Sequence, residues 1–196
     1  MQLIDNIKGN YKFLTGIAPY SSGVVAMSGY EIKHVTFHNP LPYRDGFGVI
    51  DQYLHAQGQS RHALCAIVLR SPKPVPFDGF AEFNGQYQSI LVEWDLLVDA
   101  MNPIARTNVA PAVQQPADVM LYGFSYTMPS DAHGLPPTFI VAGAGDLIEG
   151  NLIQDAVIRP NETSVDAIQE KAAYVMSMMG ARLSGLRVDW ADVTTV

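Results

Sequence analysis

Two long segments in which apolar residues recur every three or four positions constrain the fold of this chain most. The first spans residues 79–98 and follows Asp78, a residue type that often caps helix N-termini. It predicts a helix with a single apolar face, which must be buried against another element. That predicted face consists of Phe80, Phe83, Tyr87, Leu91, Trp94 and Val98.

The second such segment spans residues 164–184 and also predicts a helix. Thr163 or Ser164 supplies its N-terminal cap, and Gly185 follows at the position where helices commonly end on glycine. Its predicted apolar face consists of Val165, Ile168, Ala172, Val175, Met179 and Leu183.

Shorter apolar runs between turn residues predict five or six strands. Residues 23–37 predict a hairpin or two short strands, because Gly29 interrupts their apolar pattern. The glycine- and proline-rich residues 38–60 predict turns with one short helical turn at 50–54, and residues 102–116 predict a loop. The remaining predicted strands are Ala63–Arg70, Val119–Thr127, Thr138–Ala144 and Asp189–Val196.

This order of elements predicts an α+β fold. Both long helices have one face to bury, so we expect them to pack on the same face of one mixed sheet. No linker interrupts the sequence. We therefore expect one domain over residues 1–196, built from two similar halves at about 1–128 and 129–196.

The composition excludes several classes of protein. A hydrophobic content of 48% and a charged content of 16% are typical of a folded domain, not of a disordered chain. The net charge of −7 argues against a nucleic-acid partner. No apolar stretch reaches the roughly 20 residues that span a bilayer, and residues 1–11 lack the core of a signal peptide. With a single cysteine and no internal disulfide, we expect a cytoplasmic protein without a membrane partner.

Few side chains have the spacing that chemistry requires. The five histidines form no metal-binding motif, so we expect no metal. Cys65 lies inside an apolar run and predicts a buried, inert thiol. Arg106 is the strongest candidate, because prolines restrain its segment and a guanidinium binds a carboxylate through two hydrogen bonds. A solvent-exposed arginine near a helix C-terminus is the alternative that its spacing leaves open.

Four short motifs stand out in the sequence: Pro19-Tyr20-Ser21, Ser28-Gly29, Phe83-Asn84 with Tyr87, and Pro103-Ile104-Ala105-Arg106-Thr107-Asn108-Val109. Together they resemble the Rid family, also known as YjgF-like or L-PSP proteins. Residues 164–196 resemble a helix and strand of that family that ordinarily precede the arginine motif but follow it here, so the chain resembles a rearranged or extended member.

The resemblance implies a fold, an assembly and a set of site residues. The implied fold is a chorismate-mutase-like sheet with two helices, assembled as a homotrimer with pockets between subunits. Arg106, Tyr20 and Ser28 match catalytic positions, with Arg106 binding the substrate carboxylate. Asn84, Asn108 and Tyr122 match positions that bind substrate, and Tyr122 stands where many members have a glutamate that holds water.

The resemblance also implies an activity, the hydrolytic deamination of an enamine or imine of a small carboxylic acid. A 2-aminomuconate-type substrate is one such acid, and the chemistry needs no cofactor. The replacement of the expected glutamate by Tyr122 leaves an alternative open: a non-catalytic module on the same fold that binds a small carboxylate.

Overall fold

The strands form two four-stranded sheets in the computed structural model, which describes residues 1–74, 77–131, 134–148 and 153–196. The first sheet is antiparallel, in the order β1 (Leu3–Asn6), β2 (Tyr11–Leu14), β3 (Gly23–Ala26) and β8 (Phe139–Val141). The second is mixed, in the order β4 (Tyr30–Pro42), β7 (Met120–Pro129), β5 (Leu64–Arg70) and β6 (Ala105–Val109), with β5 and β6 parallel. The α+β class predicted from the sequence is confirmed.

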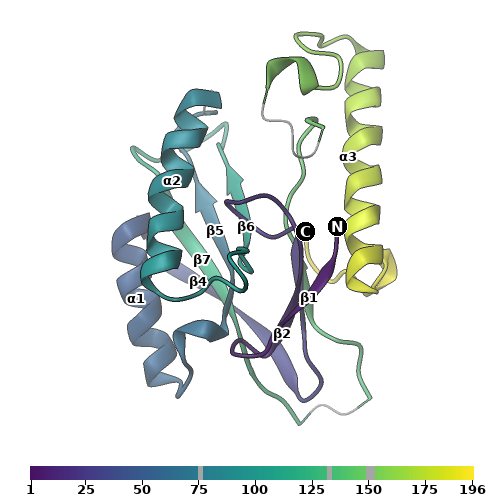
Figure 1. The fold of residues 1–196 in the computed structure, drawn as a ribbon. Helices are drawn as coiled ribbons and strands as arrows, with labels where there is room; N and C mark the ends of the chain where they lie inside the picture. Colours follow the sequence, from purple (N-terminus) through teal and green to yellow (C-terminus); the bar gives the residue numbers. More distant parts are fainter. Residues whose placement is uncertain (75–76, 132–133, 149–152) are drawn as a thin grey trace.

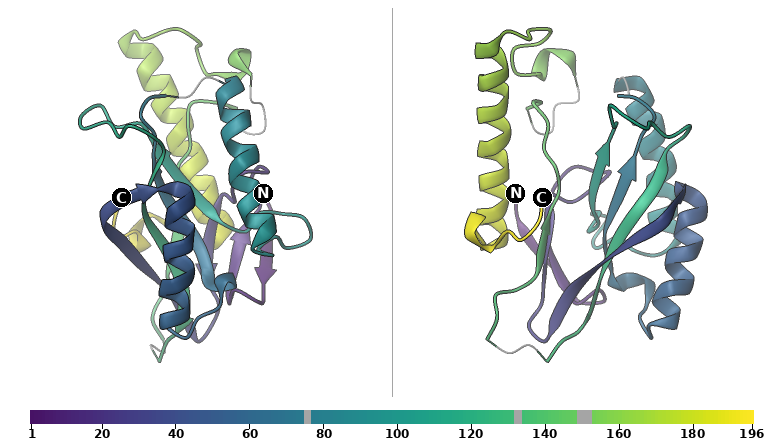
Figure 2. Two further views of the ribbon diagram at one scale, coloured as in Figure 1. Left: turned by 90° about the vertical axis from the view of Figure 1, so that its left-hand side faces the viewer. Right: turned by 180° about the vertical axis from the view of Figure 1, so that it is seen from behind.

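The helices cover the two outer faces of this pair of sheets (Figures 1 and 2). Helices α1 (Tyr43–Ala56) and α2 (Phe77–Glu93) pack on the second sheet, and α3 (Val165–Leu186) packs on the first. The predicted arrangement of both long helices on one face of a single sheet is therefore wrong. The reason is that the first sheet lies between α3 and the second sheet, so each long helix buries its side chains in a different layer.

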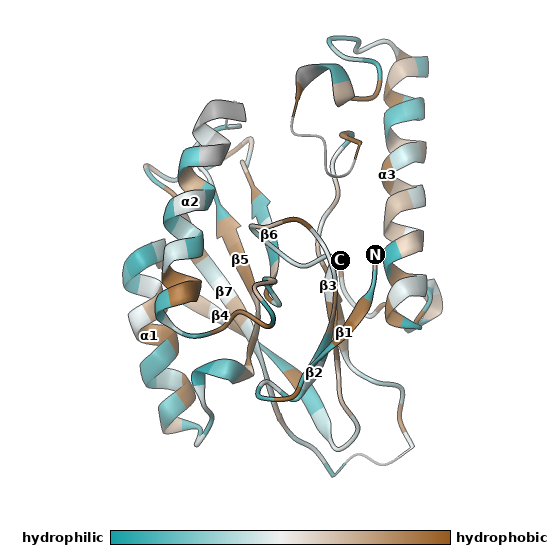
Figure 3. Ribbon diagram, viewed as in Figure 1, coloured by the Kyte–Doolittle hydropathy of each residue, from teal (hydrophilic) through white to brown (hydrophobic). Residues whose placement is uncertain are grey.

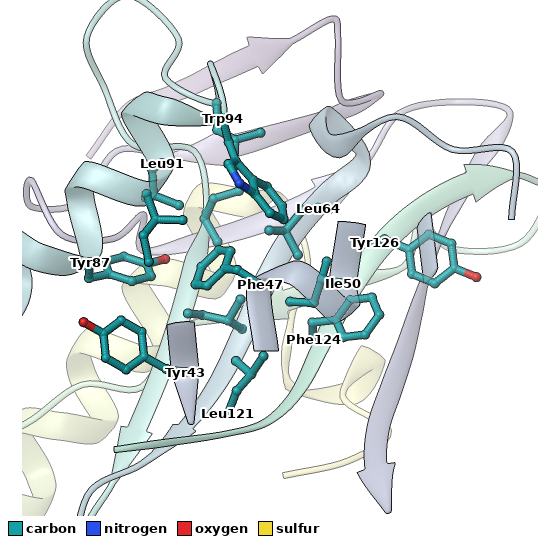
Figure 4. Close-up of a cluster of buried hydrophobic side chains, with 14 of the residues drawn as sticks. Tyr43, Phe47, Ile50, Leu64, Tyr87, Leu91, Trp94, Leu121, Phe124 and Tyr126 are labelled. Atoms are coloured by element: carbon teal, nitrogen blue, oxygen red, sulfur yellow. The ribbon is translucent and has the colours of Figure 1, made fainter. Parts of the chain in front are cut away.

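Three clusters of buried apolar side chains hold these layers together. The largest joins α1 and α2 to the second sheet and includes Phe47, Ile50, Tyr87, Leu91 and Phe124 (Figure 4). The cluster between the sheets consists of Tyr11, Phe13, Val24, Cys65, Ala66, Ala105 and Ala142. The third joins the first sheet to α3 and its C-terminal flank through Leu14, Val25, Leu183, Leu186 and Val188.

Strand β5 takes part in two of these clusters, and it matches the strand predicted at residues 63–70. It is apolar along most of its length (Figure 3), as expected for a strand that is covered on both faces. Leu64, Ile67 and Leu69 face the helices, whereas Cys65 and Ala66 face the first sheet. The prediction that Cys65 is buried is confirmed, and burial raises the pKa of its thiol.

Helix α1 is longer than the short turn predicted at residues 50–54. Its buried side chains Tyr43, Phe47, Ile50 and Leu54 have helical spacing, but the surrounding glycines and prolines obscured this pattern. Gly46 is required by packing, because a Cβ atom there would lie 2.5 Å from Leu121 Cδ2 and 3.1 Å from Leu121 Cβ.

Helix α3 begins and ends close to the predicted limits, but of its predicted buried face only Leu183 is fully buried. Its buried residues are Ala167, Arg182, Leu183 and Leu186, whereas Val165 and Ile168 are 76% and 50% exposed. The first sheet lies beside the C-terminal half of the helix (Figure 1), so it does not cover Val165 and Ile168 near the N-terminus. Gly185 lies inside the helix, which ends at Arg187 in the left-handed conformation.

Three further predictions from the sequence need correction. Of the two alternatives for residues 23–37, two separate strands are confirmed and the hairpin is wrong, because β3 pairs with β2 and β8 while β4 pairs with β7 in the other sheet. Residues 189–196 form no strand; Trp190–Asp192 is a short 3-10 helix that Asp189 caps. Helix α2 begins at Phe77, one residue before the predicted cap, and ends at Glu93, before Val98. The side chains of Asp78 and Phe80 lie outside the described residues.

Helix α1 and strand β5 precede α2 and β6, so a helix and strand already lie before the arginine motif. The predicted halves, 1–128 and 129–196, share the first sheet because β8 pairs with β3. Among the described residues, no helix is both long and apolar enough to cross a membrane.

We expect opposite effects on stability from alanine at the two glycines of α1. Gly46→Ala crowds Leu121 and should lower the free energy of unfolding by about 1–3 kcal/mol. Gly48 is exposed and a Cβ atom there meets nothing within 4 Å, so Gly48→Ala should raise it by roughly 0.5–1 kcal/mol. Urea unfolding followed by circular dichroism measures both, and equal shifts in one direction would show that α1 does not lie against Leu121.

Candidate functional site

The parallel pairing of β6 with β5 positions Arg106. Arg106 pairs with Ile67, and Ile67 pairs with Phe124; both partners belong to the cluster under α1 and α2. The Arg106 side chain therefore lies on the helix-covered face, and the neighbouring Ala105 faces the first sheet. Arg106 is only 4% exposed, so neither the predicted loop nor a solvent-exposed arginine is correct.

Among the described side chains, Asn84, Tyr20, Phe83 and Tyr87 lie around the Arg106 guanidinium, and we call these residues together with Arg106 the arginine site. Arg106 Nη2 donates a hydrogen bond of 2.8 Å to Asn84 Oδ1 on α2. Three aromatic rings lie near the guanidinium carbon Cζ, with centroids 4.9 Å (Tyr87), 5.0 Å (Tyr20) and 5.6 Å (Phe83) away. Such contacts stabilise a buried cation and restrict its orientation.

The electrostatics of the site favour an anionic ligand. Burial lowers the pKa of Arg106, yet an arginine keeps its charge in proteins. Asn84 is a neutral amide, and burial raises the pKa of Tyr87, so its phenol is protonated and neutral at physiological pH. A carboxylate at this guanidinium would gain a charge-assisted hydrogen bond in a largely dry environment.

Tyr20 reaches the site because the loop after β2 is hydrogen-bonded to the start of β6. The Ser21 amide donates to Ile104 O at 2.9 Å, and Ser21 Oγ donates to Pro103 O at 3.0 Å. Ser21 also forms a parallel bridge with Ala105. These bonds fix Ser21, which follows Tyr20, beside Ala105, which precedes Arg106.

Of the other residues predicted for the site, Asn108 lies nearest in the fold. It follows Arg106 by two positions on β6, and alternation places both side chains on the same side of the strand. Asn108 is exposed, and its Oδ1 accepts a hydrogen bond of 2.9 Å from Ser71 Oγ.

The structure places Ser28 far from the arginine site. Arg106 is level with Val35 of β4 across the paired strands, and Ser28 precedes Tyr30, the first residue of β4. At about 3.3 Å per residue, the separation along the strand alone exceeds ~15 Å. Ser28 is exposed and instead lines a separate pocket of about 360 Å³ together with Tyr30, Glu31, Ser130 and Thr138.

Tyr122 also lies outside the arginine site. Leu121 and Phe124 both face α1 and α2, and the β5–β7 register shifts beside them, which is typical of a β-bulge. The Arg70 guanidinium stacks on the Tyr122 ring at 5.2 Å. Leu69 faces the helices, so Arg70 and the ring it covers lie toward the opposite face of the sheet. The bulge thus separates Tyr122 from Arg106.

The structure therefore brings together Arg106, Tyr20 and Asn84 and adds two residues that sequence reasoning assigned to the core. Tyr87 lies three positions after Asn84 on α2, a spacing that places both on one side of the helix, and Phe83 directly precedes Asn84. The signal for both was their place with Asn84 in one short motif. Within the described part of the chain, no three potential metal-ligating side chains lie together.

Two buried tyrosines should respond oppositely to loss of their hydroxyl. Tyr87 Oη has no hydrogen-bond partner among the described residues, so Tyr87→Phe should leave the free energy of unfolding unchanged or raise it. Tyr11 Oη donates to Leu64 O at 3.0 Å, so Tyr11→Phe should lower it by about 1 kcal/mol. Urea unfolding of both variants tests this, and a clear loss of stability in Tyr87→Phe would contradict it.

Comparison with known proteins places this site in context. Residues 3–196 match the model of a family described as 2-aminomuconate deaminase CnbZ. The chain is also 35% identical over 188 residues, 95% of its length, to a 2-amino-5-chloromuconate deaminase of Comamonas testosteroni, of which it covers 75%. No solved structure matches the chain.

Proposed function

The chain belongs to the family of 2-aminomuconate deaminase CnbZ, within the Rid/YjgF-like group, and from this we propose that it deaminates a 2-aminomuconate-type acid. The reaction is the hydrolysis of an enamine or imine of a small carboxylic acid, with release of ammonia. The proposal includes the Rid-like fold and the cytoplasmic homotrimer that the resemblance implies.

The observation that carries this proposal is the burial of Arg106 among one amide and three aromatic rings. The hydrogen bond to Asn84 fixes the orientation of the guanidinium, a planar group that can bind a carboxylate through two parallel hydrogen bonds. Tyr20 and Phe83 are half-buried and form the outer wall of the arginine site. The conjugated chain of the substrate would lie against these rings.

The reaction needs no cofactor, because water is its only co-reactant. The enamine takes up a proton at carbon and becomes the imine, and water then adds to the carbon of the C=N bond. The nitrogen receives a proton and leaves as ammonia while the carbon–oxygen double bond forms. The products are a 2-oxo acid and ammonia, and the protein contributes orientation of the carboxylate and of the attacking water.

The roles within the site follow from the positions of the groups. Arg106 binds the carboxylate, Asn84 orients Arg106, and the Tyr20 hydroxyl holds water or the substrate nitrogen. Asn108 lies at the exposed end of the same strand face and contacts the rest of the substrate. Ser28 can act here only if a second copy of the chain brings it to the site, as pockets between subunits would allow. Tyr122 is left with no role in the arginine site of its own chain.

The alternative function is a module that binds a small carboxylate without turning it over. The position of Tyr122 favours keeping this candidate, because the residue at the place of the water-holding glutamate faces away from Arg106. The same residues would bind the ligand in both cases, so turnover decides between them.

Three substitutions in the arginine site should separate a carboxylate-binding role from a purely structural one. Arg106→Ala should lower kcat/KM by roughly 30- to 1,000-fold, equivalent to about 2–4 kcal/mol, and Arg106→Lys should recover little. Asn84→Asp puts a competing carboxylate beside the guanidinium, so it should abolish substrate binding while keeping or raising the melting temperature. Ammonia release from 2-aminomuconate, and from 2-imino acids made in situ by an amino-acid oxidase, is the assay.

Arg187→Ala is the matched control, since Arg187 is an exposed arginine at the end of α3, and it should retain full activity. Full activity of Arg106→Ala would show that the site lies elsewhere. If the wild-type protein turns over neither substrate yet binds muconate in an Arg106-dependent way, the binding module is the correct function.

A further inference from the structure

We propose that Arg182 of α3 is a positioning residue for the arginine site, acting through a series of hydrogen bonds that ends at Tyr20. This inference rests on the proposed function for its effect on catalysis. Its structural part, the control of the loop that carries Tyr20, stands on the contacts alone.

The series begins at the C-terminal half of α3. Arg182 is 4% exposed, and its Nη1 donates hydrogen bonds to two successive carbonyl oxygens, those of Ala142 at 2.8 Å and Gly143 at 2.9 Å. Both residues directly follow β8. One charged nitrogen thus fixes the backbone at the end of this strand, and charge-assisted bonds of this kind are stronger than neutral ones.

The fixed backbone in turn holds the loop that precedes β3. The Ala142 amide donates to Ser22 O at 3.1 Å, and the Ser22 amide donates to Leu14 O at 2.9 Å. Through these two bonds the fully buried Ser22 is attached to β2 and to the residue that follows β8. One of the two carbonyls that Arg182 holds belongs to Ala142, the residue whose amide binds Ser22.

The next residue crosses to the second sheet. Ser21, also fully buried, binds Ile104 O through its amide and Pro103 O through its hydroxyl, just before Arg106 on β6. The preceding residue, Tyr20, lies over the Arg106 guanidinium at 5.0 Å. The segment from Tyr20 to Ser22 is thus fixed between the α3 side and the arginine site, and loss of either attachment frees the Tyr20 ring.

A side chain with fewer or weaker hydrogen-bond donors than arginine cannot hold the carbonyls of Ala142 and Gly143 equally well. Methionine at position 182 would fill a similar volume but donate no hydrogen bond, and lysine would keep one charged donor without the planar guanidinium. Arg182→Met is therefore the test variant, Arg182→Lys the partial rescue, and Arg187→Met the control that removes an exposed charge from the end of the same helix.

The first readout needs no ligand. Amide hydrogen exchange of Ser21, Ser22 and Ala142 should become at least about tenfold faster in Arg182→Met, less so in Arg182→Lys, and stay unchanged in Arg187→Met. Amides of β5 in the middle of the second sheet should stay protected. Equal acceleration throughout the protein, or none in this loop, would overturn the proposal, and Arg182→Lys provides the answer if Arg182→Met does not fold.

The second readout is catalytic. Arg182→Met should raise KM for the carboxylate substrate about tenfold with a smaller change in kcat, which loss of stability alone would not produce. Tyr20→Leu should raise KM at least as much and also lower kcat, because it removes the hydroxyl as well as the ring, and the double variant should be hardly worse than Tyr20→Leu alone, because Arg182 acts only through Tyr20. Additive effects, or an unchanged KM despite faster exchange, would refute the positioning role.

The two readouts also separate this inference from the proposed function. If the wild-type protein releases no ammonia, the proposed function fails, and the exchange data still decide whether Arg182 fixes the loop. If the wild type is active and Arg182→Met shows neither change, only the inference about Arg182 fails.

Discussion

The parallel pairing of β6 with β5 is the interaction on which the rest of this structure depends. Because side chains alternate along a strand, it sends Ala105 into the layer between the sheets and Arg106 into the layer beneath α2. The small alanine allows the first sheet to approach closely, and the long arginine reaches Asn84 and the aromatic rings. The β5–β6 register thus determines both the contact between the sheets and the geometry of the arginine site.

Burying a guanidinium is unfavourable unless its charge and its donors are compensated. Arg106 and Arg182 are buried to the same degree but are compensated differently. Arg182 donates to backbone carbonyls, which completes a structural contact between α3 and β8. Arg106 has a side-chain amide and the faces of rings around it, groups that orient a cation without neutralising it. The first arrangement suits a fixed support, and the second suits a ligand-binding cation.

The C-terminal segment connects these two features. Helix α3 lies on the far side of the first sheet, so it cannot touch Arg106 itself (Figure 2). Its influence passes through the loop before β3, the place where backbone hydrogen bonds reach from the first sheet to the start of β6. The part of the chain that follows the arginine motif thus supports the site from the opposite side of the first sheet.

Local patterns in the sequence predicted the strand at 63–70, two long helices and the choice of Arg106, Asn84 and Tyr20 as candidate site residues, because apolar spacing, caps and short motifs act within a few residues. Which layer each element joins was decided only by tertiary structure. An apolar stripe does not specify its partner, so the prediction of both long helices on one face of a single sheet was wrong. The bulge that turns Tyr122 away from Arg106, and the separation of Ser28 from it, depend on register across strands distant in sequence. Burial of Arg106 was equally hidden, since its environment comes from α2 and the loop after β2, which only the folded chain brings together.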